Sequence, residues 1–180
     1  MLTETQRKQL LTLAREAIAA ALNGSRPDVQ ADQFDETLRR PSGAFVTLTE
    51  DDELRGCIGS IEPVAPLYLA VAQSAINAAF RDPRFRPLGP EELSKVHLEI
   101  SVMGPIEKVA DVNEIQVGRD GVIISRGRSA GLLLPQVATD YGWDRETFLE
   151  QTCVKAGLPR KAWQEAGTTI EKFSAEVFGE

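Results

Sequence analysis

The chain has 180 residues, of which 42% are hydrophobic and 26% charged. This balance excludes a wholly disordered chain and suits a single domain over residues 1–180. Its 27 acidic residues outnumber the 20 lysines and arginines and give a net charge of −7. This balance disfavours general nucleic-acid binding, because such proteins usually carry a basic surface.

The two cysteines, Cys57 and Cys153, are too few for a disulfide framework or a cysteine-based zinc site, so we expect reduced thiols in a cytoplasmic protein. Charged residues interrupt the first 20 positions and exclude the apolar core of a signal peptide. The longest uncharged run, residues 63–80, contains prolines, polar side chains and many alanines. It predicts a buried helix and no membrane span.

The N-terminal segment is predicted to form a helix over residues 3–22. Thr3 and Gln6 fit a capping box, Asn23-Gly24 supplies the left-handed exit, and the apolar residues between them recur at helical spacing. A polar connection over residues 24–42 is expected to follow.

Strand and helix patterns alternate along the rest of the chain. Residues 44–48 and 54–61 are predicted to form a hairpin around the turn Glu50-Asp51-Asp52. Residues 96–102 alternate apolar and polar side chains, as a half-buried strand does. The remaining expected elements are helical pieces at 91–94 and 112–115, strands at 121–126 and 131–134, helices at 135–141, 144–156 and 160–165, and a closing strand at 168–177. Hairpin-paired strands mixed with helices predict an α+β fold with a largely antiparallel sheet and flanking helices.

The segment Leu54–Ser60 holds two glycines within a predicted strand. Strand interiors rarely contain glycine unless a bulge, a ligand or another backbone comes close. Regular alternation would place Arg55, Cys57 and Gly59 on one face, where the charge of the arginine favours a nucleophilic thiolate. The alternative is a small buried Cys57 beside a structural ion pair.

His97 is the only histidine, so any imidazole chemistry depends on it. It shares a predicted strand face with Glu99 and Ser101, which can orient the ring. Nothing in the sequence brings this face to Cys57, and a surface or cross-strand histidine is the preferred interpretation. No recognised spacing supplies three or four ligands, so no metal site is expected.

The loop Arg81–Arg86 concentrates three arginines around Asp82 and Pro83. Such a loop can clamp a carboxylate or phosphate through bidentate hydrogen bonds, with Arg84 as the candidate residue. The alternative is that Asp82 caps a turn and the arginines are solvated. No nucleotide-binding glycine loop, serine elbow or CxxxCxxC cluster occurs, so no cofactor is expected.

The hexapeptide Leu54–Gly59 resembles the signature of the AMMECR family. The resemblance continues through Asp82–Phe85 and Leu132–Ala138. It then covers nearly the whole chain in the expected order, through Gly142-Trp143, Lys155–Leu158, Phe173 and Phe178. Ser60 stands where the family often has threonine, and this change keeps a hydroxyl.

This resemblance implies an antiparallel α+β fold with a larger and a smaller lobe that form a cleft. It also implies association with a Memo-like protein and a radical-SAM protein, in the AmmeMemoRadiSam system to which the family contributes protein A. The function expected is that of an enzyme or enzyme component acting in the cleft on a small anionic substrate. The alternative is a non-catalytic ligand-binding or carrier component of the same system. The candidate residues are Cys57 and Arg55 for catalysis, and Gly56, Gly59, Ser60, Arg84 and Gln136 for substrate binding.

Overall fold

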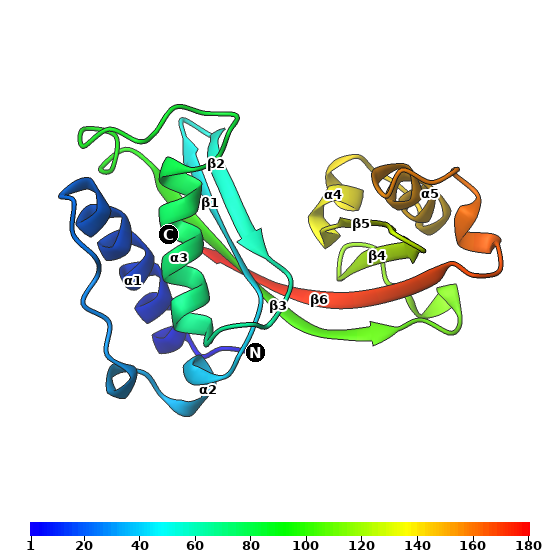
Figure 1. Cartoon of the computed structure of the whole chain (residues 1–180), viewed down its shortest axis with the longest axis horizontal. Helices are drawn as coiled ribbons and strands as arrows, with labels where there is room; N and C mark the ends of the chain where they lie inside the picture. Colours follow the sequence, from blue (N-terminus) through cyan, green and yellow to red (C-terminus); the bar gives the residue numbers. More distant parts are fainter. The chain divides into compact units, whose positions relative to one another are not determined.

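The computed structural model describes all 180 residues and divides the chain into two compact units (Figure 1). Unit 1 comprises residues 1–103 and 176–180, and unit 2 comprises residues 104–175. The helices and strands, in chain order, are α1 (Glu4–Leu22), η1 (Ala31–Gln33), α2 (Glu36–Arg39), β1 (Ala44–Glu50), β2 (Glu53–Ser60), α3 (Leu67–Phe80), β3 (His97–Lys108), η2 (Val112–Glu114), β4 (Asp120–Arg126), β5 (Ser129–Leu133), α4 (Pro135–Asp140), α5 (Arg145–Lys155), η3 (Ala162–Gln164) and β6 (Thr169–Gly179). The predicted α+β class with an antiparallel sheet is confirmed, whereas the cleft between lobes stays a prediction.

The strands form a six-stranded sheet in the order β2-β1-β3-β6-β4-β5. In unit 1, β1 lies between β2 and β3 and is antiparallel to both. In unit 2, β4 lies between β5 and β6 and is again antiparallel to both. The long strands β3 and β6 contribute residues to both units. Strand β2, which carries the glycine-containing motif, is therefore an edge strand.

Each unit has its own apolar core. In unit 1, α3 packs on β1 and β2, and α1 packs beside α3 (Figure 1). The apolar stripe predicted for the first helix is buried there, together with side chains of the strands: Leu10, Ala14, Ile18, Val46, Leu48, Leu98 and Ile100. In unit 2, α5 packs on β4 and β5 around Phe148, Leu149 and Cys153.

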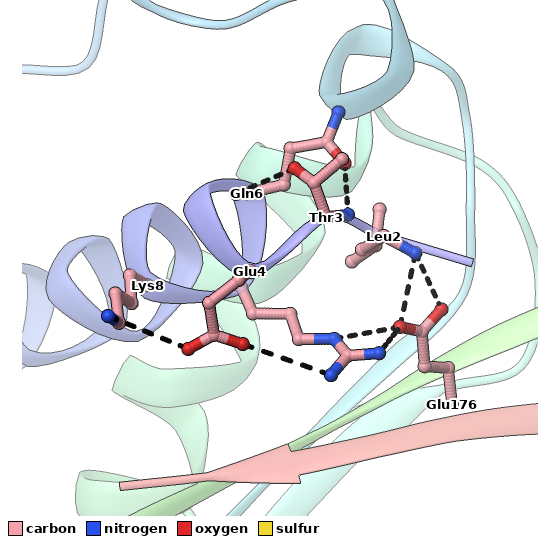
Figure 2. A network of polar contacts seen from close by, with 7 residues as sticks. Leu2, Thr3, Glu4, Gln6, Lys8 and Glu176 are labelled. Carbon is pink, nitrogen blue, oxygen red and sulfur yellow. Dashed lines mark hydrogen bonds and ion pairs between the residues drawn. The ribbon is translucent and has the colours of Figure 1, made fainter.

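Hydrogen bonds fix the start of α1 and attach it to β6. Thr3 and Gln6 form the predicted capping box of α1. Glu176 in β6 then holds this helix start, because its carboxylate accepts the Leu2 N–H at 2.9 and 3.1 Å and Arg7 Nη2 at 2.8 Å (Figure 2). The first helix is thus attached to the final strand within unit 1.

The structure differs from the predicted elements in a few places. The helix predicted over residues 63–80 begins only at Leu67, because Pro66 is its extended N-cap with ψ of 141° and a proline disfavours helical geometry in the residue before it. None of the helices, α3 included, combines the length and the apolar character that crossing a membrane requires. The predicted connection over 24–42 contains η1 and α2, and residues 91–94 form hydrogen-bonded turns in place of a helix.

Candidate functional site

The motif strand β2 contains a β-bulge at Arg55. On β1, the neighbours Leu48 and Thr49 pair with Gly56 and Leu54. Arg55 is therefore an extra residue without a partner on β1, which defines a bulge. The sequence prediction assumed that side chains alternate regularly between the two faces of the strand. The bulge interrupts this alternation between Arg55 and Cys57.

Cys57 lies on the sheet face opposite α3, since its neighbour Gly56 faces that helix and successive strand residues alternate between faces. Thr47 is its cross-strand partner, and the threonine hydroxyl donates to the Cys57 Sγ at 3.2 Å. Thr47 in turn pairs with Glu99 on β3, and His97 lies two residues before Glu99. The only histidine therefore shares the face of Cys57 but is separated from it by β1. No cluster of three or more His, Cys, Asp or Glu side chains that could hold a metal ion is present.

Asp82 and Arg84 cover the free edge of β2 at Cys57. The Cys57 N–H donates to Oδ2 of Asp82 at 3.0 Å, and its carbonyl accepts from Nη2 of Arg84 at 3.4 Å. The Asp82 carboxylate, only 2% exposed, also accepts from the Arg84 backbone N–H, Nε and Nη2 at 3.1, 2.9 and 2.7 Å. These contacts replace the partner strand that an edge strand lacks. They hold the pKa of Asp82 well below its usual range, chiefly through the Arg84 side chain.

Arg84 remains available to solvent although it is paired. Its side chain is 55% exposed. The pKa of Arg84 is raised, chiefly by its hydrogen bond to Asp82. Its Nη2 contacts the carbonyl oxygen of the motif cysteine, which no other arginine does.

Arg55 instead forms a buried ion pair with Glu92. Nε of Arg55 lies 2.9 Å from Oε1 of Glu92, and the side chains are 11% and 6% exposed. Glu92 also accepts the Gly89 N–H at 2.7 Å and lies 3.1 Å from Nη1 of Arg86. Nη1 of Arg55 is buried without a hydrogen-bond partner. A structural ion pair, the alternative weighed for this motif, thus accounts for Arg55, and its role as the partner of the Cys57 thiolate stays a prediction.

The Arg55–Glu92 pair should make stability depend on acid pH. Hydrogen bonding from Arg55, then from the Gly89 N–H, lowers the pKa of Glu92 from 4.5 to about 2. A lowered folded-state pKa stabilises the folded protein above the unfolded-state value, and this stabilisation is lost as pH falls toward the folded-state value. Urea unfolding should therefore show a constant free-energy difference between wild type and Glu92→Gln above about pH 5. The difference should shrink toward pH 2, and a difference independent of pH would contradict the pairing.

The two motif glycines allow close backbone approaches. A Cβ on Gly56 would lie 2.2 Å from the carbonyl oxygen of Ala78 in α3. A Cβ on Gly59 would lie 2.3 Å from the Ala44 carbonyl oxygen and 2.5 Å from the Phe45 Cα. Of the reasons that predict glycine within a strand, the approach of another backbone applies at both positions.

The remaining candidate residues lie elsewhere. Gly59 and Ser60 line a cavity of about 870 Å³ beside α3, which neither Cys57 nor Arg84 lines. Gln136 lies in α4 of unit 2, where its buried Oε1 has no hydrogen-bond partner. Within unit 1, the predicted residues are thus divided between the Cys57 face and this cavity.

Three residues of the site, Thr47, Asp82 and Glu92, were not predicted as site residues. Glu92 lies 37 residues from Arg55 in the chain, and no local pattern marks it as the partner of that arginine. Thr47 belongs to the predicted hairpin, but its pairing with Cys57 depends on the bulge. The position of the turn alone does not give this register.

The AMMECR1 family model matches residues 11–178. A protein of Methanothermobacter thermautotrophicus is 45% identical over 185 aligned residues, which cover 99% of this chain and 96% of that protein. A protein of Aquifex aeolicus is 43% identical and covers 96% and 92% in the same way. The crystal structure of an uncharacterized protein from Pyrococcus horikoshii is 42% identical, with a TM-score of 0.86 over 96% of this chain and 90% of that chain. The resemblance predicted from the motifs is confirmed.

Proposed function

Because this chain belongs to the AMMECR1 family, we propose that it is an enzyme or enzyme component that acts on a small anionic substrate at Cys57, together with a Memo-like and a radical-SAM partner. One arrangement carries the proposal. The half-buried Cys57 thiol has the Thr47 hydroxyl at 3.2 Å, and the exposed guanidinium of Arg84 is held against the cysteine backbone.

The charges around the motif favour an anion. Three guanidinium groups, from Arg55, Arg84 and Arg86, meet only two carboxylates, from Asp82 and Glu92. These ion-paired groups therefore sum to a charge of +1, in a chain whose net charge is −7. Nearby charges outweigh distant ones, because salt screens the latter. A carboxylate or phosphate approaching Cys57 would meet the half-exposed side chain of Arg84 first.

Cys57 acts as the nucleophile in this proposal. The thiolate is the reactive form of cysteine, and the hydrogen bond from the Thr47 hydroxyl orients the Cys57 sulfur. Arg55 contributes indirectly, because its buried pair with Glu92 holds the bulge beside Cys57. Arg55 is a positioning residue on this view, Thr47 is the side chain in contact with the reacting sulfur, and Arg84 contacts the Cys57 carbonyl oxygen.

The second candidate function is a ligand-binding or carrier component without turnover. Its support is the position of His97, which lies across β1 from Cys57, so no imidazole can take a proton from the thiol directly. Turnover by the mixture of this protein and its two proposed partners distinguishes the candidates. A Cys57→Ser variant that supports full turnover would favour the carrier.

Thiol labelling tests the chemistry of Cys57. Iodoacetamide should modify Cys57 faster than Cys153, because Cys153 is fully buried in α5 and burial raises the pKa of its thiol. The rate of labelling by the anionic reagent iodoacetate should also depend on the positive charge of Arg84. Arg84→Gln should slow labelling of Cys57 by iodoacetate about threefold more than labelling by the neutral iodoacetamide, as read by peptide mass spectrometry.

Arg84→Lys is the matched control for this experiment. It keeps the positive charge and should largely preserve the preference for iodoacetate. The proposal that Cys57 is a nucleophile at an anion site is refuted if Cys153 reacts faster than Cys57. It is also refuted if Arg84→Gln slows labelling by iodoacetate and by iodoacetamide to the same extent.

A further inference from the structure

A cavity of about 870 Å³ lies beside α3 in unit 1, and we call it the α3 groove. Four parts of the chain form its walls: α3 itself, the end of β2 with the loop over residues 60–65, the start of β1, and the end of α1 with the segment that follows it, residues 21–29. Its volume lies within the range of small-molecule binding sites. The groove therefore has room for an organic ligand.

The walls of the α3 groove are largely apolar. Leu69 and Ile76 of α3, Ile58 of β2 and Val64 of the following loop all line it. Val64 and Leu69 are 80% and 41% exposed, so two large apolar side chains face solvent at one hollow. Covering them with the apolar part of a ligand would be favourable, because the gain is proportional to the apolar area removed from water.

Two unpaired arginines also line the α3 groove. Arg26 and Arg81 make no ion pair or side-chain hydrogen bond, whereas Arg40, Arg55 and Arg84 in the same unit are each paired with a carboxylate. The groove contains only one acidic residue, Glu62, so its net charge is +1. Free guanidinium groups beside an apolar surface complement a ligand that has an anionic head and an apolar body.

We propose that the α3 groove binds an amphipathic organic anion. Its carboxylate or phosphate head pairs with Arg26 and Arg81, and its apolar body packs against Val64, Leu69 and Ile76. The site is separate from the proposed chemistry at Cys57. Ile58 packs with the core on the α3 side of β2, and side chains alternate along a strand, so the Cys57 thiol points to the opposite face.

Calorimetric titration of the full chain with octanoate, octyl phosphate and octanol tests this proposal. We expect one equivalent of each anion to bind, at concentrations below micelle formation, and octanol to bind at least about tenfold more weakly because it lacks the charge. The stronger of the two anions identifies the preferred head group. Similar affinities for octanol and octanoate would overturn the proposal.

Variants assign the binding to the groove. Arg26→Gln combined with Arg81→Gln should weaken octanoate binding at least about tenfold, whereas Arg128→Gln, at an exposed unpaired arginine of unit 2, should have no effect. Leu69→Ser should also weaken binding, and Ile106→Ser, with a similar exposure of 40%, should not. The single arginine variants serve if the double variant does not fold. Unchanged octanoate binding in the arginine variants would overturn the proposal.

Cys57→Ser separates this site from the proposed function. The groove should bind octanoate with wild-type affinity in this variant, even if the thiol chemistry is abolished. Loss of octanoate binding in Cys57→Ser would place thiol and ligand in one site and overturn the proposal of a separate groove.

Discussion

Asp82→Ala should lower the free energy of unfolding by about 3 kcal/mol. The carboxylate is almost fully buried and accepts hydrogen bonds from the Cys57 N–H and from three N–H groups of Arg84. The alanine variant leaves the Cys57 N–H without an acceptor and Arg84 without its counter-charge. Because Arg84 is half-exposed, water recovers part of its loss. Urea unfolding followed by circular dichroism measures the difference.

Asp140→Ala is the matched control for Asp82→Ala. Asp140 ends α4, is exposed and makes no side-chain hydrogen bond, so its removal should change stability by less than about 0.5 kcal/mol. Hydrogen exchange gives a second readout that global stability alone does not explain. The Cys57 amide should exchange much faster in Asp82→Ala than the other β2 amides do. Continued protection of that amide would contradict the assigned acceptor.

Gly56→Ala should also cost about 3 kcal/mol. The added methyl would lie 2.2 Å from the Ala78 carbonyl oxygen, and this atom belongs to the backbone of α3 and cannot rotate away. The helix would have to move off β2, and the apolar contacts of the unit 1 core would loosen with it. Thermal and urea unfolding should both report the loss.

Gly89→Ala provides the comparison for Gly56→Ala. Its added methyl would meet the Glu91 carboxylate at 2.7 Å, the flexible end of an exposed side chain that can turn into solvent. We expect a change below about 1 kcal/mol. Equal stability of the Gly56→Ala and Gly89→Ala variants would mean that β2 and α3 do not approach as closely as the structure has them.

The amino-acid sequence predicts those features that depend on a few neighbouring residues. The capping box of Thr3 and Gln6 and the start of α5 at the cap Asp144 both rely on contacts within one helical turn. The turn at Asp51 and Asp52 is equally local, and both residues have the positive φ that tight hairpin turns require. Such signals, together with the motifs of the AMMECR1 family, predicted the α+β class and most element positions.

The surroundings of Cys57 depend on long-range contacts that no local pattern predicts. A regular hairpin in which Glu50 pairs with Glu53 would place Cys57 opposite Val46, which is fully buried. The bulge at Arg55 shifts the register by one residue, so Cys57 pairs with Thr47 on the other face instead. That bulge is held by Glu92, 37 residues further along the chain. Local periodicity assumes a regular strand, and a contact over this separation in sequence forms only when the chain folds.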